Sequence, residues 1–351
     1  MFGGRMNILV IGGSGLLGTR TALAALSHGH TVSILARGNS ELQPEIVSKV
    51  RFMSGDIYTM QDRELQAAVL AHDAVVYSMG IDDRHLHHRP SYDEFHADHV
   101  TMCMKVLRIA RENGVRKFVV FGSYFTYFDR VFPEMELAKH HVYIRTRCEQ
   151  RDAVLGESRP DFETFMLELP YIIGYLPGKV PPWTFLFTML AARGQRALFF
   201  PTGGTAAVTA AQVGEAAVGA IERGTGGTAY PIAGCNLTWA DFAHTFFNVT
   251  NRPKRLIGLS PVMFRLFGIV NSFILYLRGR ERGLSIHHFA DFQYMDAFID
   301  PEPTMKALGY AHADYGKELS ELITEWTRIN GVKRADHLPP EERSTESGIQ
   351  G

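Results

Sequence analysis

Short apolar runs alternate along this chain with longer segments in which apolar and polar residues follow a helical spacing. The apolar runs predict β-strands at residues 8–11, 31–36, 50–57, 73–78, 117–121 and 162–170. The intervening segments predict helices at 19–28, 62–71 and 91–113, the last of which is stopped by Gly114. Strands that alternate with helices at this spacing indicate an α/β protein with a doubly wound parallel sheet.

The texture of the chain changes at about residue 171, where prolines and aromatic residues become frequent. We therefore predict that residues 1–175, with a returning segment at about 205–235, form the domain that contains the sheet. Residues 176–204 and 236–330 are predicted to form a smaller C-terminal substrate-binding lobe. The polar stretch at 331–351 is expected to be a disordered tail.

One strongly apolar segment, residues 256–277, stands out within the predicted lobe. Arg265 and Asn271 interrupt it, and three arginines follow it at positions 278, 280 and 282. A membrane-spanning helix needs about 20 predominantly apolar residues, and this segment falls slightly short. We favour a buried lid helix over an apolar substrate pocket. Interfacial membrane contact through about 256–282, supported by the basic flank, and a true membrane span are the less favoured alternatives.

A glycine motif directly follows the first predicted strand. Gly12, Gly15 and Gly18 stand between the strand at 8–11 and a helix that starts at Thr19. Gly12 would allow a sharp turn, Gly15 has no Cβ to block a pyrophosphate, and Gly18 would let the helix pack closely on the sheet. The N–H groups and positive dipole end of that helix would attract phosphate oxygens. In this context the motif predicts a Rossmann-type dinucleotide site rather than an ordinary glycine-rich turn.

The residues after the second strand bear on the choice of cofactor. NAD-preferring proteins of this type place an acidic residue there, which hydrogen-bonds the ribose 2′-hydroxyl. This chain has Arg37 at that place, with Arg20 near the first helix. A guanidinium can pair in bidentate fashion with a 2′-phosphate. We therefore predict NADP as the cofactor, with NAD as the alternative. A solvated surface arginine is the simpler interpretation of Arg37.

The bulk composition is that of an ordinary globular protein. The chain has 351 residues, of which 46% are hydrophobic and 21% charged, and its formal net charge is −1. This balance indicates no nucleic-acid partner. Cys103, Cys148 and Cys235 lie far apart and predict free thiols. With no signal peptide apparent, we expect a cytoplasmic protein. The histidines between Arg84 and Arg89 lack metal-ligand spacing, so we predict no metal site and a loop lining the cofactor cleft.

Together these features resemble the extended and atypical short-chain dehydrogenase/reductases, the superfamily that contains epimerase/dehydratase-like and 3β-hydroxysteroid-dehydrogenase-like proteins. The resemblance covers about residues 6–328 and rests on the three glycines and on the segments Gly55-Asp56-Ile57, His99-Val100-Thr101, 114–119, 170–174 and 213–217. It implies an NAD(P)-dependent enzyme in which Asp56 contacts the adenine. Further cofactor contacts are expected from Leu16, Leu17, Ile57, Ser78, Gly80, Arg147, Pro170 and Ile173.

The resemblance also implies where the catalytic residues lie. The family places a tyrosine four residues before a lysine on one helix face, and the cation lowers the phenol pKa so that the phenol can exchange a proton as hydride moves. Here Tyr143 is present, and Arg147 stands where the lysine is expected. The serine that holds the substrate carbonyl corresponds to Ser123, or to Tyr124 if the register differs by one.

Other residues bear on the reaction and the substrate. His99 replaces the family's asparagine, and it either supports a proton-relay water or simply packs. Glu168 stands where many sugar-nucleotide enzymes of the family carry an arginine, which disfavours a substrate with a diphosphate group. Aromatic residues of the lobe suit either an apolar substrate or an ordinary core: Trp183, Phe185, Phe187, Phe199, Phe200, Phe246 and Phe247.

We therefore predict an oxidoreductase that transfers hydride between NADP(H) and a carbonyl or alcohol group of a fairly apolar small molecule. Two alternatives stay open. One is an NAD-dependent sugar-nucleotide epimerase or dehydratase. The other is a non-catalytic NADP(H)-binding sensor, which the altered tyrosine–lysine pair suggests. The resemblance also implies a possible homodimer through the helices at 91–113 and 143–156.

Overall fold

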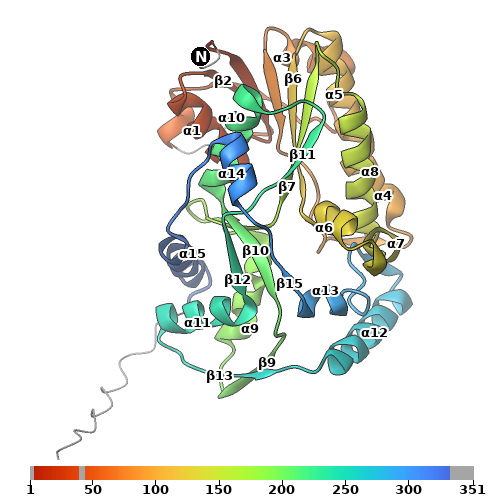
Figure 1. Ribbon diagram of the computed structural model, residues 1–351, viewed down its shortest axis with the longest axis vertical. Coiled ribbons are helices and arrows are strands. Elements are labelled where there is room, and N and C mark those ends of the chain that lie inside the picture. Colours follow the sequence, from red (N-terminus) through yellow and green to blue (C-terminus); the bar gives the residue numbers. More distant parts are fainter. Residues whose placement is uncertain (1–3, 39–43, 333–351) are drawn as a thin grey trace, which may run out of the picture.

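The computed structural model describes residues 4–38 and 44–332. Within this part the chain forms a parallel seven-stranded sheet covered by helices on both faces, with a C-terminal lobe below it (Figure 1). The strand order β3-β2-β1-β4-β6-β7-β11 reverses direction at the junction of β1 and β4. The predicted α/β fold with a Rossmann-type, doubly wound parallel sheet is therefore confirmed. The predicted disordered tail lies outside the described residues from 333 onwards.

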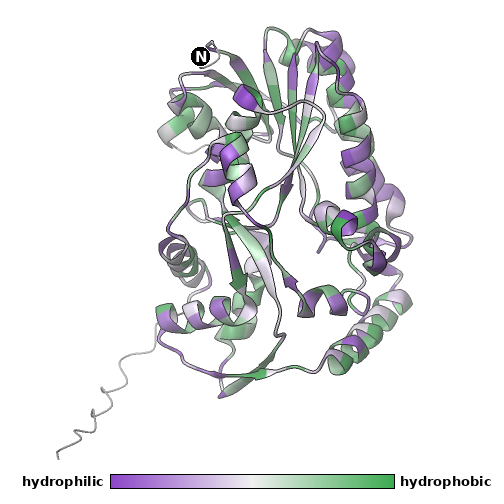
Figure 2. Ribbon diagram, in the orientation of Figure 1, coloured by the Kyte–Doolittle hydropathy of each residue, from purple (hydrophilic) through white to green (hydrophobic). Residues whose placement is uncertain are grey.

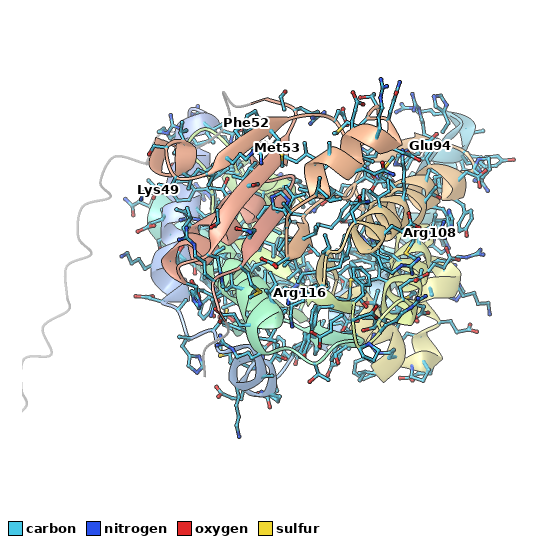
Figure 3. The ribbon with its side chains drawn as sticks, turned by 90° about the horizontal axis from the view of Figure 1, so that it is seen from above. Lys49, Phe52, Met53, Glu94, Arg108 and Arg116 are labelled. Carbon is cyan, nitrogen blue, oxygen red and sulfur yellow. The ribbon has the colours of Figure 1, made fainter. Side chains whose placement is uncertain are left out.

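The large sheet consists of the six predicted strands and one strand that returns from the C-terminal half. Its strands are β1 (Asn7–Ile11), β2 (Thr31–Ala36), β3 (Arg51–Ser54), β4 (Ala74–Tyr77), β6 (Lys117–Ser123), β7 (Glu163–Leu169) and β11 (Thr228–Pro231). Successive side chains of a strand enter different cores, as Phe52 and Met53 of β3 do (Figure 3). Because both faces are covered, the strands are continuous apolar runs, which is why the sequence predicts them well.

The helices of the Rossmann-type part form two layers. One face of the sheet carries α1 (Leu16–Ser27), α10 (Ala210–Arg223) and α14 (Glu302–Leu308), and the other carries α3 (Asp62–Val69), α5 (Cys103–Glu112) and α8 (Val142–Gly156). The predicted helix at 91–113 is α4 (Tyr92–His96), a π-helical turn (Ala97–Met102) and α5 in sequence. Shorter helices are α2 (Pro44–Val47), α6 (Phe125–Val131), α7 (Leu137–His140) and the 3₁₀ turn Pro133–Met135.

The lobe is built around a small second sheet. Its strands are β8 (Tyr171–Ile173), β10 (Gly204–Thr209), β12 (Cys235–Thr238) and β15 (Asp296–Ala297), and β9 (Ala197–Phe200) pairs with β13 (Arg255–Gly258) beside it. The helices are α9 (Phe185–Ala191), α11 (Trp239–Thr250), α13 (Ala290–Tyr294), α15 (Tyr315–Ile329) and the 3₁₀ turn Pro182–Thr184. Most of the predicted aromatic set forms the lobe's core, namely Trp183, Phe187, Phe200, Phe246 and Phe247. Phe185 and Phe199 are exposed instead.

The strongly apolar segment forms α12 (Pro261–Leu277), but it is not a buried lid, and that prediction is wrong. Of the residues in α12, all of which the structure describes, only Gly268 is buried. The helix packs on the protein through this glycine, because a Cβ there would lie 2.6 Å from the backbone nitrogen of His287. Most of its apolar side chains are exposed, whereas Phe264 and Leu275 are half-buried. None of the helices among the described residues is both long enough and apolar enough to cross a membrane.

Candidate active site

The glycine turn has the shape that the sequence predicts. Gly12 adopts a φ of +81°, and a Cβ on it would lie 2.7 Å from the backbone oxygen of Ser78. A Cβ on Gly18 would overlap the backbone of Gly12, so only glycine lets α1 start this close to β1. Gly15 is exposed, and a Cβ there would face open space apart from the Gly12 oxygen at 3.3 Å. The turn therefore leaves one side free for a ligand.

The residues of this turn fit the pyrophosphate of a dinucleotide. Helix α1 begins at Leu16 with Gly15 as its N-cap, and no side chain caps it. Its first-turn N–H groups, which include those of Leu16 and Leu17, are therefore available to phosphate oxygens. The turn also stands where the strand order reverses, the place where doubly wound sheets bind dinucleotides. These residues would hold the pyrophosphate of the bound cofactor.

The predicted adenosine contacts lie beside the turn, at the carboxyl ends of β2 and β3. The Gly12 N–H donates to the Leu35 oxygen at 2.9 Å, which joins the turn to the end of β2. Arg37 follows this strand and is exposed. Asp56 is half-buried after β3 and accepts a hydrogen bond from the Tyr58 N–H at 3.1 Å, while Ile57 is buried. The structure thus brings Arg37, Asp56 and Ile57 to the same edge of the sheet.

Tyr143 and Arg147 share one face of α8, with the guanidinium carbon 5.3 Å from the tyrosine ring centroid. Arg147 is 6% exposed and lies under the loop after β4. Its Nη1 donates to Gln150 Oε1 at 2.8 Å, and its Nη2 donates to the Ile81 oxygen at 3.5 Å. Its Nε is buried without a hydrogen-bond partner among the described residues. A buried donor without a partner, close to the carboxyl ends of the strands where a dinucleotide would bind, fits a ligand group that accepts a hydrogen bond, such as a ribose hydroxyl.

The electrostatic balance at Tyr143 differs from the prediction. Burial raises the pKa of Tyr143 above its ordinary value. The Arg147 cation lowers this pKa in part, and the carboxylates of Asp82 and Asp83 raise it further. The ring packs at right angles to Phe95, with ring centroids 6.0 Å apart. The predicted lowering toward neutrality is therefore not what this environment gives without cofactor and substrate.

The two candidates for holding the substrate carbonyl lie together at the end of β6. Ser123 is buried, and its Oγ accepts a hydrogen bond from the Phe125 N–H at 3.4 Å. Tyr124 is buried as well, and its hydroxyl lies 3.1 Å from Thr205 Oγ1 on β10. Burial also raises the pKa of Tyr124 well above its ordinary value. Both hydroxyls therefore have partners inside the protein, and the roles of both residues remain predictions.

His99 packs rather than facing open space. It is 0% exposed, and its Nε2 donates to the Ile81 oxygen at 3.1 Å while its Nδ1 accepts from the Thr146 hydroxyl at 2.9 Å. Burial, with a smaller contribution from the Arg147 charge, lowers the pKa of His99 well below its ordinary value. A neutral imidazole matches these two bonds. It connects the π-helical turn to α8 and to the loop that covers Arg147.

The sequence analysis did not identify the charged cluster Asp82, Asp83 and Arg84, which follows β4. Arg84 donates through its Nε to Asp82 Oδ1 at 2.5 Å, and its Nη2 lies 3.6 Å from Asp83. Burial raises the pKa of Asp83 to about 6, although Arg84 opposes this. The same carboxylate raises the pKa of Tyr143 and of Tyr171. One signal in the sequence could have identified this cluster: Asp82 and Asp83 stand next to each other in the loop after β4, a strand whose carboxyl end lies at the predicted cofactor site.

The predicted residues at the end of β7 and after it are buried. Pro170 is buried, and Ile173 is 0% exposed within the lobe's apolar core. Glu168 is also 0% exposed and accepts two hydrogen bonds from Arg130, at 2.6 and 2.8 Å. Thr126 donates to the same carboxylate at 2.5 Å. Glu168 is therefore a buried carboxylate held by Arg130 and Thr126, and the cofactor contacts of Pro170 and Ile173 remain predictions.

The histidine-rich segment forms structure of its own. Residues Leu86–His88 are strand β5, which pairs antiparallel with β14 (Arg280–Arg282) instead of forming an open loop at the cofactor cleft. His87 is buried and hydrogen-bonds Glu94 through Nδ1. Within residues 4–38 and 44–332, no group of three or more histidine, cysteine or acidic side chains is arranged to hold a metal ion.

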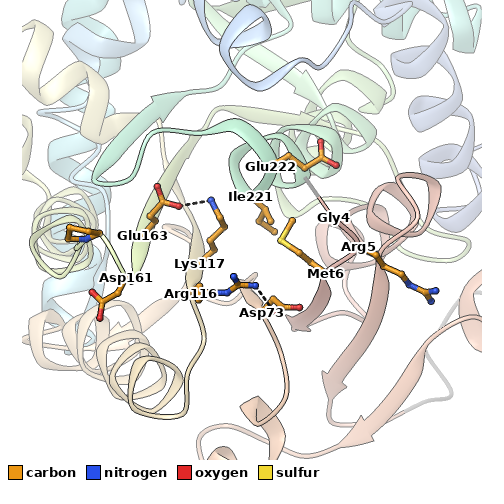
Figure 4. Close-up of a pocket in the computed structure, with 11 residues that line it drawn as sticks. Gly4, Arg5, Met6, Asp73, Arg116, Lys117, Asp161, Glu163, Ile221 and Glu222 are labelled. Atoms are coloured by element: carbon orange, nitrogen blue, oxygen red, sulfur yellow. Dashed lines mark hydrogen bonds and ion pairs between the residues drawn. The ribbon is translucent and has the colours of Figure 1, made fainter. Parts of the chain in front are cut away.

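A hollow at the opposite edge of the sheet has different properties. It lies at the amino ends of the strands and is lined by Arg5, Asp73, Arg116, Lys117, Glu163 and Glu222, among others (Figure 4). Arg116 pairs with Asp73 at 2.7 Å and Lys117 with Glu163 at 2.5 Å. Ligands of doubly wound sheets bind at the carboxyl ends of the strands, and the charges in this hollow neutralise one another. We assign it no ligand.

The glycine turn at the point where the strand order reverses is the arrangement of a dinucleotide-binding fold. Residues 8–146 match the NAD dependent epimerase/dehydratase family, in agreement with the superfamily that the sequence resembles. The matched segment contains the glycine turn, the loop after β4, Tyr143 and the end of β6. A comparison with curated proteins gives no match.

Solved structures share the fold over almost the whole chain. The structure of gox2253 has a TM-score of 0.73 at 18% identity, covering 94% of this chain and 100% of that one. PA4631, a nucleoside-diphosphate-sugar epimerase from Pseudomonas aeruginosa, has a TM-score of 0.70 at 17% identity, with the same coverage. The Bordetella bronchiseptica enzyme WbmH, in complex with NAD⁺, has a TM-score of 0.66 at 14% identity, covering 93% of this chain and 99% of that one. At these identities the likeness concerns the fold.

Proposed function

We propose that this chain is an oxidoreductase that transfers hydride between NADP(H) and a carbonyl or alcohol group of a fairly apolar small molecule. The observation that carries the proposal is the arrangement of Tyr143 and Arg147 on one face of α8. Their helix face lies under the loop after β4, at the sheet edge that also carries the glycine turn. Hydride chemistry at a carbonyl needs a proton donor and a held cofactor at the same edge.

Each residue would have a separate task. The nicotinamide ring supplies or accepts the hydride when the cofactor is bound. Arg147 would hold the ribose hydroxyls through donors such as its unpartnered Nε and would keep a positive charge beside the phenol. Tyr143 would pass a proton to or from the substrate oxygen, and Ser123 or Tyr124 would donate a hydrogen bond to that oxygen. Arg37 would pair with the 2′-phosphate.

The charges around the site support an uncharged substrate. Arg84 is already paired with Asp82 and Asp83, and Arg130 is paired with Glu168. A nucleotide-diphosphate sugar would need cations that are free to meet its phosphates. The cluster after β4 instead carries two carboxyl groups to one guanidinium, which disfavours an anionic group there. The exposed Phe185, whose ring lies 5.9 Å from the Arg84 guanidinium, offers an apolar contact.

Cofactor preference is tested by titrating the purified protein with NADPH and NADH while following nicotinamide fluorescence. We expect tighter binding of NADPH, and a loss of about ten-fold or more in the Arg37→Ala variant, which corresponds to ~1.4 kcal/mol. Arg51→Ala is the matched control, because Arg51 is an exposed arginine at the opposite end of β3. Equal affinity for both cofactors, or an unchanged NADPH affinity in Arg37→Ala, contradicts the assignment of NADP.

The reaction is tested by assaying the reduction of apolar ketones with NADPH. We expect Tyr143→Phe to lose at least about a hundred-fold in kcat, the range typical of general acid catalysis. Tyr127→Phe is the control, since Tyr127 lies on α6 and has no assigned role. If kcat is the same in Tyr143→Phe as in the parent, Tyr143 takes no part in the reaction, whichever cofactor the protein prefers.

A second function is favoured by the family match, which covers residues 8–146. An NAD-dependent epimerase or dehydratase would retain its cofactor through the reaction cycle. Denaturing the purified protein and measuring released NAD⁺ distinguishes the two: stoichiometric NAD⁺ that does not exchange with added NADPH supports the epimerase. Tight binding of exchangeable NADPH without turnover on any ketone tested would instead support the sensor.

A further inference from the structure

Helix α12, at the lower end of the lobe, consists mostly of hydrophobic residues (Figure 2), and most of them are exposed. Ten of its apolar side chains are between 42% and 68% exposed: Val262, Met263, Leu266, Phe267, Ile269, Val270, Phe273, Ile274, Tyr276 and Leu277. A contiguous apolar surface of this kind on a soluble protein marks a site of interaction.

The exposed apolar residues occupy one side of the helix. At about 100° per residue, they fall within roughly half of the circumference, and Gly268, Asn271 and Ser272 fall on the other side. Gly268 is buried against His287, and Asn271 and Ser272 are half-buried. The side of α12 that carries Gly268, Asn271 and Ser272, together with the half-buried Phe264 and Leu275, thus faces the protein, and the side with the ten exposed apolar residues faces outward. A helix that packs on a soluble core has the opposite orientation.

Positive charge lies beside this apolar face. Arg278 follows the helix and is exposed, and Arg280 and Arg282 are half-buried on β14. The Arg89 guanidinium lies 4.7 Å from the ring centroid of Tyr276. Arg89, Arg280 and Arg282 line one groove, in which they outnumber the carboxylate of Glu281. Lys139 lines the same groove but pairs with Glu136. Because the whole chain has a formal net charge of −1, this is a local concentration of cations.

We propose that α12 docks the protein on the surface of a bilayer that contains anionic lipids. The helix would lie in the plane of the interface, with its apolar half against the acyl chains and the flanking arginines at the headgroup phosphates. Its 17 residues, about 26 Å of helix, suit contact along the surface. A second copy of the chain would cover the apolar half but would gain nothing from the arginines beside it. The proposal is independent of the reaction proposed above.

The test is flotation of the purified full chain with vesicles of phosphatidylcholine alone or of phosphatidylcholine mixed with phosphatidylserine. We expect binding to the mixed vesicles that weakens as salt is added. Phe267→Ser with Phe273→Ser should reduce the partition coefficient by about ten-fold or more, because each phenyl ring buries apolar area. Arg278→Gln with Arg280→Gln should reduce binding to the mixed vesicles and flatten the salt dependence.

Matched controls separate lipid contact from loss of fold. Val47→Ser with Leu70→Ser removes two exposed apolar side chains away from α12 and should leave vesicle binding unchanged. All variants should keep the circular dichroism spectrum of the parent chain. Absence of binding to mixed vesicles overturns the proposal, as does binding that the α12 variants do not reduce. A dimer in solution that Phe267→Ser with Phe273→Ser dissociates, without vesicle binding, shows that α12 joins two copies instead.

Discussion

The guanidinium of Arg147 lies directly against Gly80. A Cβ on Gly80 would come within 2.6 Å of Arg147 Nη2, and Gly80 adopts a φ of +146°. A glycine is therefore required here for two reasons, backbone conformation and the space that the arginine occupies. The relationship also shows how an arginine can stand where the family has a lysine: the larger head group fits under the loop after β4 because Gly80 has no side chain.

Replacing Gly80 should disturb the site and the fold together. We expect Gly80→Ala to lower the free energy of unfolding by about 1–3 kcal/mol, because the backbone is strained and Arg147 must move. NAD(P)H affinity, measured by nicotinamide fluorescence, should fall with it. The control is Gly29→Ala: Gly29 has a φ of +83°, but a Cβ there meets nothing within 4 Å. If both variants bind the cofactor as the parent does, Arg147 does not depend on Gly80 for its position.

The charge of Arg147 should govern the pH at which Tyr143 loses its proton. Burial raises the pKa of Tyr143, and the cation opposes this, so Arg147→Met should raise that pKa further. Ketone reduction needs the protonated phenol as proton donor, so the basic limb of the kcat profile, where Tyr143 loses its proton, should move in the alkaline direction. Arg145→Met is the control, because Arg145 lies on the exposed side of α8 and pairs with Glu149. If the kcat–pH profile of Arg147→Met coincides with that of the parent, the charge of Arg147 does not influence the pKa of Tyr143.

The sequence allowed the large sheet and its glycine turn to be predicted for physical reasons. Parallel strands buried on both faces must be apolar runs, and the turn requires glycines where a Cβ would overlap Ser78 or the backbone of Gly12. The lobe was harder to predict. Its strands are short, as β15 at Asp296–Ala297 shows, and their pairing joins segments far apart in the chain.

The candidate site was predicted in part. The resemblance to the family identified Tyr143 and Arg147, and their four-residue spacing puts them on one helix face. The cluster of Asp82, Asp83 and Arg84 depends instead on how the loop after β4 folds back. The lid prediction for α12 failed because hydropathy shows that a helix is apolar without showing what covers it. Which side of α12 is covered is decided by the contact between Gly268 and His287, and these residues lie far apart in the sequence.

His99 should make the protein sensitive to acid. Because burial lowers the pKa of His99 well below 6.5, the folded protein keeps the imidazole neutral, whereas the unfolded chain takes up a proton near 6.5. The unfolded state therefore binds more protons as the pH falls, and stability present above pH 6.5 is lost below it, at up to about 1.4 kcal/mol per pH unit. His141, whose pKa burial lowers to about 3, contributes in the same direction.

The measurement is urea unfolding of His99→Asn and of the parent at several pH values between about 7.5 and 5, the window in which such a histidine acts. The variant should lose less stability across this range than the parent, whatever its stability at neutral pH. His312→Asn, which alters an exposed histidine, is the control. Parallel curves for parent and His99→Asn would show that His99 is protonated in the folded protein as readily as in the unfolded chain.

The ion pair between the buried carboxylate of Glu168 and the exposed Arg130 should be structural rather than part of substrate recognition. Removing one partner leaves an unpaired charge in the core, so we expect Arg130→Met to lower the free energy of unfolding by about 3 kcal/mol. The double variant Arg130→Met with Glu168→Met should recover most of this loss, because no charge is then left unpaired. Urea unfolding of the parent, the two single variants and the double variant gives the interaction free energy between Arg130 and Glu168. If Glu168→Gln instead leaves stability unchanged while it alters the KM for a ketone, Glu168 contacts the substrate, and the structural assignment is wrong.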